Sequence, residues 1–268
     1  MTPLTATQSF LGKYHALRTI MTMMMWFDNW GDVWGCYRSG VDLPPLQFRN
    51  GLVIRHRPED QPLLQFYEVF RDQNYRRYIT DHKRGVMVDI GANIGFVTLD
   101  WTSRLPNIRV HAYEPHPATF AMLRANVDLN CPALKVKLYQ EAVGGETGII
   151  ALRASALSME TTAYHSGASA GKFEEFSVPV VALDQVIERC QADGPVTLVK
   201  IDAEGAEADI LEGAQPETLK GIRQFVIEYH DFLCPNALAR CKHALVAAGF
   251  RCTTRPAEAA QGLLYALR

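Results

Sequence analysis

The chain has 268 residues, of which 48% are hydrophobic and 21% charged, and its formal net charge is −2. This composition is typical of a globular protein made of one large domain, or of one domain with an appendage. It argues against a nucleic-acid partner, since the only basic clusters are Arg76-Arg77 and Lys83-Arg84.

The six cysteines are scattered and form no Cys-x-x-Cys pair, so we expect reduced and mostly buried thiols. The start lacks the basic-then-apolar pattern of a secretion signal, and no apolar run is long enough to span a bilayer. The sequence therefore predicts a cytoplasmic protein without a membrane span.

Residues 1–45 form a predicted N-terminal helical extension or lid. Ile20 to Trp34 contain four methionines and three tryptophans. Such a stretch either packs on the body or on a partner subunit, which would make a homodimer, or acts as a flexible apolar lid over the substrate, a role that suits methionine.

Residues 46–84 are expected to lead into the core as a hairpin and a helix. Leu46 to Ile54 contain an Asn50-Gly51 pair between two apolar runs, which predicts a β-hairpin. Asp60 is expected to cap a helix that runs through Leu63 and Phe66 to Tyr78.

The core domain is predicted over residues 85–268, beginning with the stretch Val86 to Phe96. Its pattern is a buried strand that reaches Asp89, a turn at Gly91, and a helix from about Asn93. This strand–turn–helix lacks the Gly-x-Gly-x-x-Gly spacing of a pyrophosphate site. A carboxylate at Asp89 would repel a diphosphate but suits an ammonium group and ribose hydroxyls, which favours S-adenosylmethionine (SAM). The alternative is that these residues only form a βα turn.

A second strand, Val110 to Tyr113, ends in Glu114, followed by Pro115. A carboxylate at that position of a βαβ unit can accept hydrogen bonds from both hydroxyls of a ribose. A helix from Pro117 to about Leu129 and a third strand, Lys135 to Tyr139, should follow.

The rest of the chain predicts two peripheral strands and four more core strands. Gly148 to Pro179 is rich in small and polar residues and is expected to form two peripheral strands joined by a mobile loop. Beyond it we expect helices over 183–190 and 237–248 and core strands over 197–201, 224–227, 250–254 and 263–267. Seven strands alternating with helices predict an α/β doubly wound, Rossmann-like sheet.

Two of these central strands are followed by ionisable residues. Asp202 and Glu204 follow the strand 197–201, and Glu228 and His230 follow the strand 224–227. They are candidate catalytic residues, as base and orienting groups, or candidate ligands of a divalent cation through Asp202, Glu204 and Glu228. His230 is either a base or a polar turn residue. Lys200 shares a strand face with Asp202 and either pairs with a carboxylate or has a catalytic role, and Glu207 is expected to be a first-turn helix charge.

These motifs together resemble the FkbM-type SAM-dependent methyltransferases, most specifically in Lys200-Ile201-Asp202-Ala203-Glu204-Gly205-Ala206-Glu207. The resemblance spans about Leu52 to Phe250. It implies a seven-stranded class I methyltransferase fold and O-methylation of a hydroxyl on a small molecule such as a sugar or natural product.

The resemblance also implies roles for individual residues. Asp89, Gly91, Asn93 and Gly95 would hold the methionine part of SAM, and Glu114 and Pro115 the ribose end. Gln140, Glu141 and Ala142 would lie by the adenine, and Asp202 beside the sulfonium. Two alternatives stay open: a SAM-binding sensor without turnover, and a nicotinamide-dependent dehydrogenase.

Overall fold

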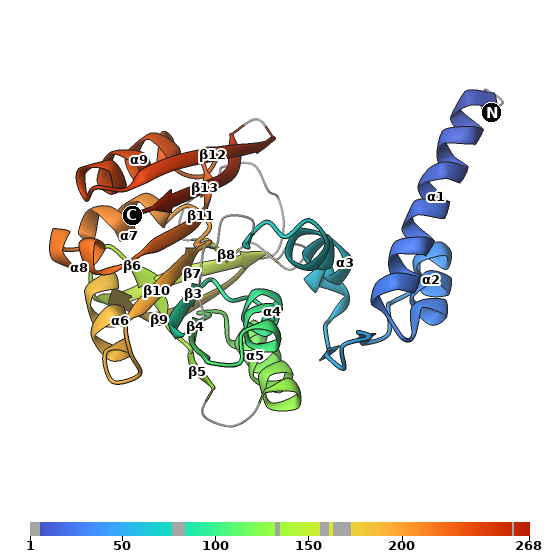
Figure 1. Cartoon of the computed structure of the whole chain (residues 1–268), viewed down its shortest axis with the longest axis horizontal. Helices are drawn as coiled ribbons and strands as arrows, with labels where there is room; N and C mark the ends of the chain where they lie inside the picture. The colour runs from blue at the N-terminus through green and yellow to red at the C-terminus, as the bar shows by residue number, and fades with distance from the viewer. Residues whose placement is uncertain (1–5, 77–83, 132–134, 156–160, 163–172, 259) are drawn as a thin grey trace. The chain divides into compact units, whose positions relative to one another are not determined.

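The computed structural model describes residues 6–76, 84–131, 135–155, 161–162, 173–258 and 260–268 (Figure 1). The chain divides into two compact units, Met1–Pro58 and Glu59–Arg268. No helix within the described ranges combines the length and apolarity that crossing a bilayer requires. All six cysteines are free, as expected.

The first unit is a helical pair with a short hairpin. Its elements are α1 (Ala6–Trp26), α2 (Trp30–Ser39), β1 (Leu46–Gln47) and β2 (Val53–Ile54). The predicted hairpin is confirmed: β1 and β2 are antiparallel, and Gly51 takes a φ of +89° in the turn. Phe27 and Phe48 are buried edge to face at a centroid distance of 4.9 Å, which anchors the hairpin to the end of α1.

The second unit is built on a seven-stranded sheet. Its spatial order is β12 (Arg251–Glu258), β13 (Gln261–Leu267), β11 (Gln224–His230), β10 (Val196–Ile201), β3 (Gly85–Ile90), β4 (Ile108–Tyr113), β5 (Val136–Tyr139). The strands from β11 to β5 are parallel, while β13 is antiparallel to both of its neighbours. The predicted doubly wound sheet of seven strands is confirmed.

Helices cover both faces of this sheet (Figure 1). One face packs against α6 (Leu183–Cys190), α7 (Glu207–Gly213), α8 (Pro216–Gly221) and α9 (Ala237–Ala247), whose apolar side chains share a core with Val88, Val199 and Ile227. The other face carries α4 (Phe96–Arg104) and α5 (Pro117–Asn130). Neighbouring residues of a strand point to opposite sides of the sheet, so alternate residues of each strand pack against the two layers of helices.

A smaller sheet stands beside the main one, in the order β6 (Ala142–Gly144), β9 (Phe173–Ala182), β7 (Gly148–Ser155), β8 (Thr161–Thr162). β7 and β9 are antiparallel, which confirms the predicted pair of peripheral strands. The loop expected between them lies largely outside the described residues.

The segment before the core differs from the prediction. Instead of one helix to Tyr78, it forms a 3-10 turn (Pro58–Asp60), a short helix α3 (Pro62–Phe66) and a π-helical turn (Tyr67–Arg71). Asp60 is not the cap, because Gln61 stands between it and the helix with a φ of +46°. Gln73, with a φ of +56°, breaks the helical path, and Tyr78 lies outside the described residues.

Two other boundaries also shift. The helix after the first turn begins at Phe96 rather than Asn93, because Asn93 (φ +51°) and Gly95 (φ +101°) both have left-handed backbones. The strand expected to end at Ile227 continues as β11 through His230, because its last residues pair with β13.

Candidate active site

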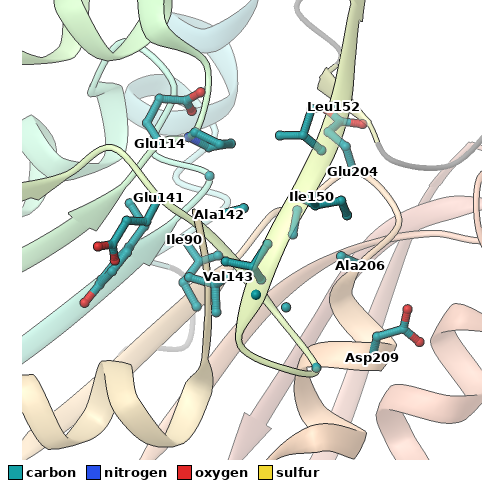
Figure 2. A pocket seen from close by; sticks show the side chains of 18 of the residues that line it. Ile90, Glu114, Glu141, Ala142, Val143, Ile150, Leu152, Glu204, Ala206 and Asp209 are labelled. Atoms are coloured by element: carbon teal, nitrogen blue, oxygen red, sulfur yellow. The ribbon is translucent and has the colours of Figure 1, made fainter. Parts of the chain in front are cut away.

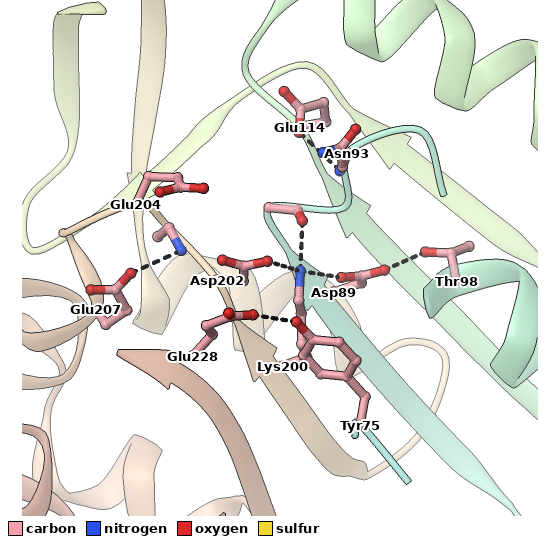
Figure 3. Close-up of polar contacts among 12 residues, drawn as sticks. Tyr75, Asp89, Asn93, Thr98, Glu114, Lys200, Asp202, Glu204, Glu207 and Glu228 are labelled. Atoms are coloured by element: carbon pink, nitrogen blue, oxygen red, sulfur yellow. Dashed lines mark hydrogen bonds and ion pairs between the residues drawn. The ribbon is translucent and has the colours of Figure 1, made fainter. Parts of the chain in front are cut away.

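The register of the central strands brings the predicted charged residues together. Lys200 of β10 lies opposite Asp89 of β3 on one side and opposite Val226 of β11 on the other. Asp202 comes two residues after Lys200, and Glu228 comes two residues after Val226, so both belong to the same face of the sheet as Lys200. Figure 3 shows them gathered around the carboxyl ends of these strands.

Lys200 is the buried centre of this group. Its Nζ lies 3.3 Å from both Asp89 Oδ1 and Asp202 Oδ2, and it donates to the Gly91 carbonyl oxygen at 2.6 Å (Figure 3). Burial alone would lower the pKa of Lys200, but Asp202, Asp89 and Glu228 together raise it well above its usual value. The predicted pairing of Lys200 with a carboxylate is therefore confirmed.

Asp89 does not project from the loop as expected. It is the penultimate residue of β3, fully buried, and its Oδ2 accepts a hydrogen bond from Thr98 Oγ1 at 2.6 Å. Thr98 belongs to α4, so Asp89 ties that helix to Lys200 and lines neither of the cavities described below. The structure shows Asp89 supporting the loop, and its contact to the methionine part of SAM stays a prediction.

Gly91 is where the loops after β3 and β10 touch. A Cβ at this position would lie 1.8 Å from the Asp202 carbonyl oxygen, and the φ of Gly91 is +72°. Only glycine fits such an approach without moving the backbone. At Gly95 the missing Cβ leaves room for Leu123 of α5, at 2.9 Å from the Cβ position, and the predicted contact of Gly95 with SAM stays a prediction.

Glu114 accepts two backbone hydrogen bonds at the end of β4. Its Oε2 accepts from Asn93 N–H at 3.0 Å and its Oε1 from His116 N–H at 2.9 Å. Burial, opposed by these two bonds and by Lys200, raises the pKa of Glu114 to about 7. Each oxygen keeps a lone pair, so the carboxylate can still accept from two further donors such as a ribose diol.

A cavity of about 410 Å³, the larger cavity, opens beside these groups. In Figure 2, Glu114 lies on one side of it, and Ile150 and Leu152 of β7 lie on the other. The predicted cofactor residues that line it are Gly91, Asn93, Glu114, Pro115, Glu141, Ala142 and Asp202. Gln140, in the connection between β5 and β6, is exposed and does not line it.

The residues of the larger cavity fit an adenosyl ligand. Its volume lies within the usual range for small-molecule sites, and its apolar wall includes Ile90, Val143 and Leu152. Glu114 offers acceptors for hydroxyls, and the glycine at 91 leaves the backbone open to close approach. Glu141 is paired with Arg189 of α6, which fixes the carboxylate at the cavity's edge.

A second cavity of about 220 Å³, the smaller cavity, lies toward α3 and α4. Gly91, Asn93, Asp202 and Glu204 line both cavities. Tyr75 and Glu68 also line the smaller one, and neither was predicted as a site residue. The Tyr75 hydroxyl donates to Glu228 Oε2 (Figure 3). Burial and the charge of Asp202, opposed by Tyr75, His230 and Lys200, raise the pKa of Glu228 to about 7.

His230 and Glu207 form a buried pair below the loop after β10. Glu207 is fully buried, and its Oε1 accepts from His230 Nδ1 at 2.8 Å, from Ala203 N–H at 3.2 Å and from Gly205 N–H at 3.0 Å. Glu207 therefore holds the loop after β10 through these hydrogen bonds, in addition to being a charge in the first turn of α7. Burial alone would lower the pKa of His230, but the hydrogen bond and charge of Glu207, with Glu204 and Asp202, raise it to about 10.

The residues at the carboxyl ends of β10 and β11 also include the predicted ligands of a divalent cation. Asp202, Glu204 and His230 each offer one ligand atom, and these atoms lie within 4.8 Å of one another. Glu228, the third expected ligand, is instead the acceptor of the Tyr75 hydroxyl. A divalent metal held by Asp202, Glu204 and Glu228 stays a prediction.

Comparison with known proteins agrees with this geometry. The family model of the methyltransferase FkbM domain matches residues 89–252. The chain is 30% identical over 214 residues to 31-O-demethyl-FK506 methyltransferase FkbM of Streptomyces tacrolimicus, covering 69% of this chain and 81% of that protein. It is 29% identical over 180 residues to Methyltransferase 1 of Beauveria bassiana, covering 61% and 71%.

A further relative is the hexuronic acid methyltransferase AglP of Haloferax volcanii, 25% identical over 155 residues, which cover 58% of this chain and 60% of that protein. The family match extends from the last residues of β3 to β12 and so includes both loops that meet at Gly91. This chain therefore belongs to the FkbM methyltransferase family, on a sheet of the class I methyltransferase type.

Proposed function

We propose that the protein transfers a methyl group from SAM to a hydroxyl of a small molecule. The observation that carries this proposal is the pair of cavities that share Gly91, Asn93, Asp202 and Glu204. A cofactor in the larger cavity and an acceptor in the smaller one would meet at these residues. The names of the FK506 and hexuronic acid methyltransferases support a hydroxyl-bearing, small-molecule acceptor.

The larger cavity would hold SAM through its own residues. Glu114 would accept from the ribose hydroxyls, Gly91 and Asn93 would face the amino-acid part, and Val143 and Leu152 would pack against the adenine. When bound, SAM supplies a methyl group on a positively charged sulfur. The buried carboxylates around Asp202 favour that charge at the junction of the cavities.

Asp202 is the proposed base. An alcohol oxygen attacks a methyl carbon well only if its proton is removed as the new bond forms. As the oxygen–carbon bond forms and the carbon–sulfur bond breaks, the hydroxyl proton would pass to the carboxylate of Asp202. Lys200 fixes that carboxylate at 3.3 Å, and positioning of this kind supplies much of the rate enhancement of a displacement reaction.

A binding experiment tests the cofactor first. Thermal shifts of the whole chain with SAM, S-adenosylhomocysteine (SAH) and NADH should show stabilisation by the two sulfur nucleosides and none by NADH. A ligand at 100 times its Kd stabilises by about 2.7 kcal/mol, which is readily detected. Stabilisation by NADH alone would support the dehydrogenase alternative instead.

A variant then tests turnover against the sensor alternative. Asp202→Asn keeps the shape of the side chain, so the variant should still bind the uncharged product SAH, while methyl transfer should fall by about 10²–10⁴-fold. Asp128→Asn, at an exposed carboxylate of α5, is the matched control and should keep full activity. Equal turnover of the Asp202 and Asp128 variants would remove Asp202 from the role of base.

A further inference from the structure

The smaller cavity has two chemically different parts. Its apolar part comes from the segment after Pro58 and from α4, and includes Leu64, Val69 and Phe96. Its polar part lies at the carboxyl ends of β10 and β11 and contains Asp202, Glu204 and Glu228. Glu68 projects from the π-helical turn as a fourth carboxyl group in the same lining. An occupant must therefore satisfy an apolar surface on one side and an acidic one on the other.

The cations of this lining are already engaged. Among its described residues, the positively charged groups are those of Lys200 and His230. Lys200 is held by Asp89, Asp202 and the Gly91 carbonyl oxygen. His230 is held at 2.8 Å by Glu207, which does not line the cavity. The four carboxyl groups thus outnumber the basic groups that could balance them, and the two basic groups are shared with carboxylates outside the cavity.

Glu68 is the carboxyl group with the least compensation. Burial raises the pKa of Glu68 to about 8, and the charges of Glu228, Asp202 and Asp72 all act in the same direction. No described cation opposes them. A positively charged group placed in the cavity would let Glu68 ionise, whereas a ligand carboxylate would add a further negative charge to this set.

We propose that the smaller cavity takes a hydroxyl acceptor that carries a protonated amine near the reacting oxygen, with Glu68 as the partner of the ammonium group. This inference rests on the proposed function, because it treats the smaller cavity as the acceptor site. It places the hydroxyl toward Asp202, one of the four residues common to both cavities, and the ammonium toward α3 and the π-helical turn. It excludes acceptors with a carboxylate at that position, such as a uronic acid.

The test uses three small probes that share a secondary hydroxyl on a three-carbon skeleton and carry an ammonium, a neutral hydroxyl or a carboxylate beside it: 1-amino-2-propanol, 1,2-propanediol and lactate. Each is small enough for a cavity of about 220 Å³, whatever the scaffold of the natural acceptor. Binding to the complex of the full chain with SAH is measured by NMR titration at pH 7 in the presence of EDTA. The amine should bind at least tenfold more tightly than the diol, and lactate should bind more weakly than either.

Variants assign the effect to Glu68. Glu68→Gln should weaken amine binding at least fivefold and leave diol binding unchanged, while Glu217→Gln, at an exposed carboxyl of α8, should change neither. SAH affinity reports on folding, because Glu68 does not line the larger cavity. The inference is refuted if the diol or lactate binds as well as the amine, if no probe binds, or if Glu68→Gln keeps the preference. Failure of SAH itself to bind would instead refute the proposed function.

Discussion

Removing the charge of Lys200 should destabilise the second unit strongly. In Lys200→Met the methylene stem keeps its packing, but Asp89 and Asp202 lose the ammonium group that lies 3.3 Å from each. The side chains of Asp89 and Lys200 are 0% and 3% exposed, so water screens this pair little. Breaking a buried pair by removing one partner costs about 3–5 kcal/mol. That is a fifth or more of the stability of a typical domain, which is about 5–15 kcal/mol.

The assay is urea unfolding followed by circular dichroism at pH 7 without ligand, and it needs two comparisons. Lys220→Met removes an exposed lysine, whose Nζ is 3.9 Å from Glu217 with side chains 47% and 81% exposed, and should cost less than about 0.5 kcal/mol. Lys200→Met combined with Asp89→Asn should recover most of the loss, because the fully buried residue 89 is then neutral and the Asp202 side chain, which is 25% exposed, is partly solvated.

Two results would refute this reasoning. The first is a loss of stability in Lys200→Met no larger than that in Lys220→Met. The second is a double variant as unstable as Lys200→Met alone. The loss of stability would then come from packing and not from the unpaired charge of Asp89.

Three further predictions concern the cofactor loop and the buried histidine. Gly91→Ala should abolish SAH binding, measured by calorimetry, because its Cβ would lie 1.8 Å from a carbonyl oxygen; Gly221→Ala, with nothing within 4 Å of the Cβ position, should bind normally. Glu114→Gln should weaken SAM binding about 10–100-fold, the value of one charged hydrogen bond of about 1.5–3 kcal/mol, and an unchanged Kd would contradict the ribose role. The pKa of His230 is raised from 6.5 to about 10, so the stability it contributes is complete below pH 6.5 and is lost as pH rises toward 10. Denaturation at pH 8 and pH 10 should therefore show a smaller loss in His230→Gln than in the native chain, and equal losses would count against the Glu207 pair.

Much of the fold was predictable because its signals are local. Apolar runs of strand length, the glycine turn and the proline at the start of α5 predict elements that the structure contains. The acidic edge was predictable too, since Asp202 and Glu204 directly follow a buried strand. The boundary near Asn93 was missed because a left-handed asparagine leaves no periodic signal in the sequence.

The contacts of individual side chains depend on register and on distant segments. Whether Asp89 faces a ligand or a helix is decided by its pairing opposite Lys200, which the sequence of β3 alone does not contain. Tyr75 and Glu228 meet across 153 positions of chain. Glu68 stands in an apolar stretch, where a single carboxyl is readily assigned to the exposed side of a helix.

The contact between Gly91 and Asp202, together with the ammonium of Lys200 beneath it, has a consequence for how sequences of this kind can diverge. A larger residue at 91 requires a different path for the backbone at 202, and a neutral residue at 200 requires a neutral one at 89. Positions 89, 91, 200 and 202 should therefore be inherited as a set. Relatives in which one of these four residues differs should differ at the others as well. In such relatives we expect the carboxyl ends of β3 and β10 to serve a different reaction.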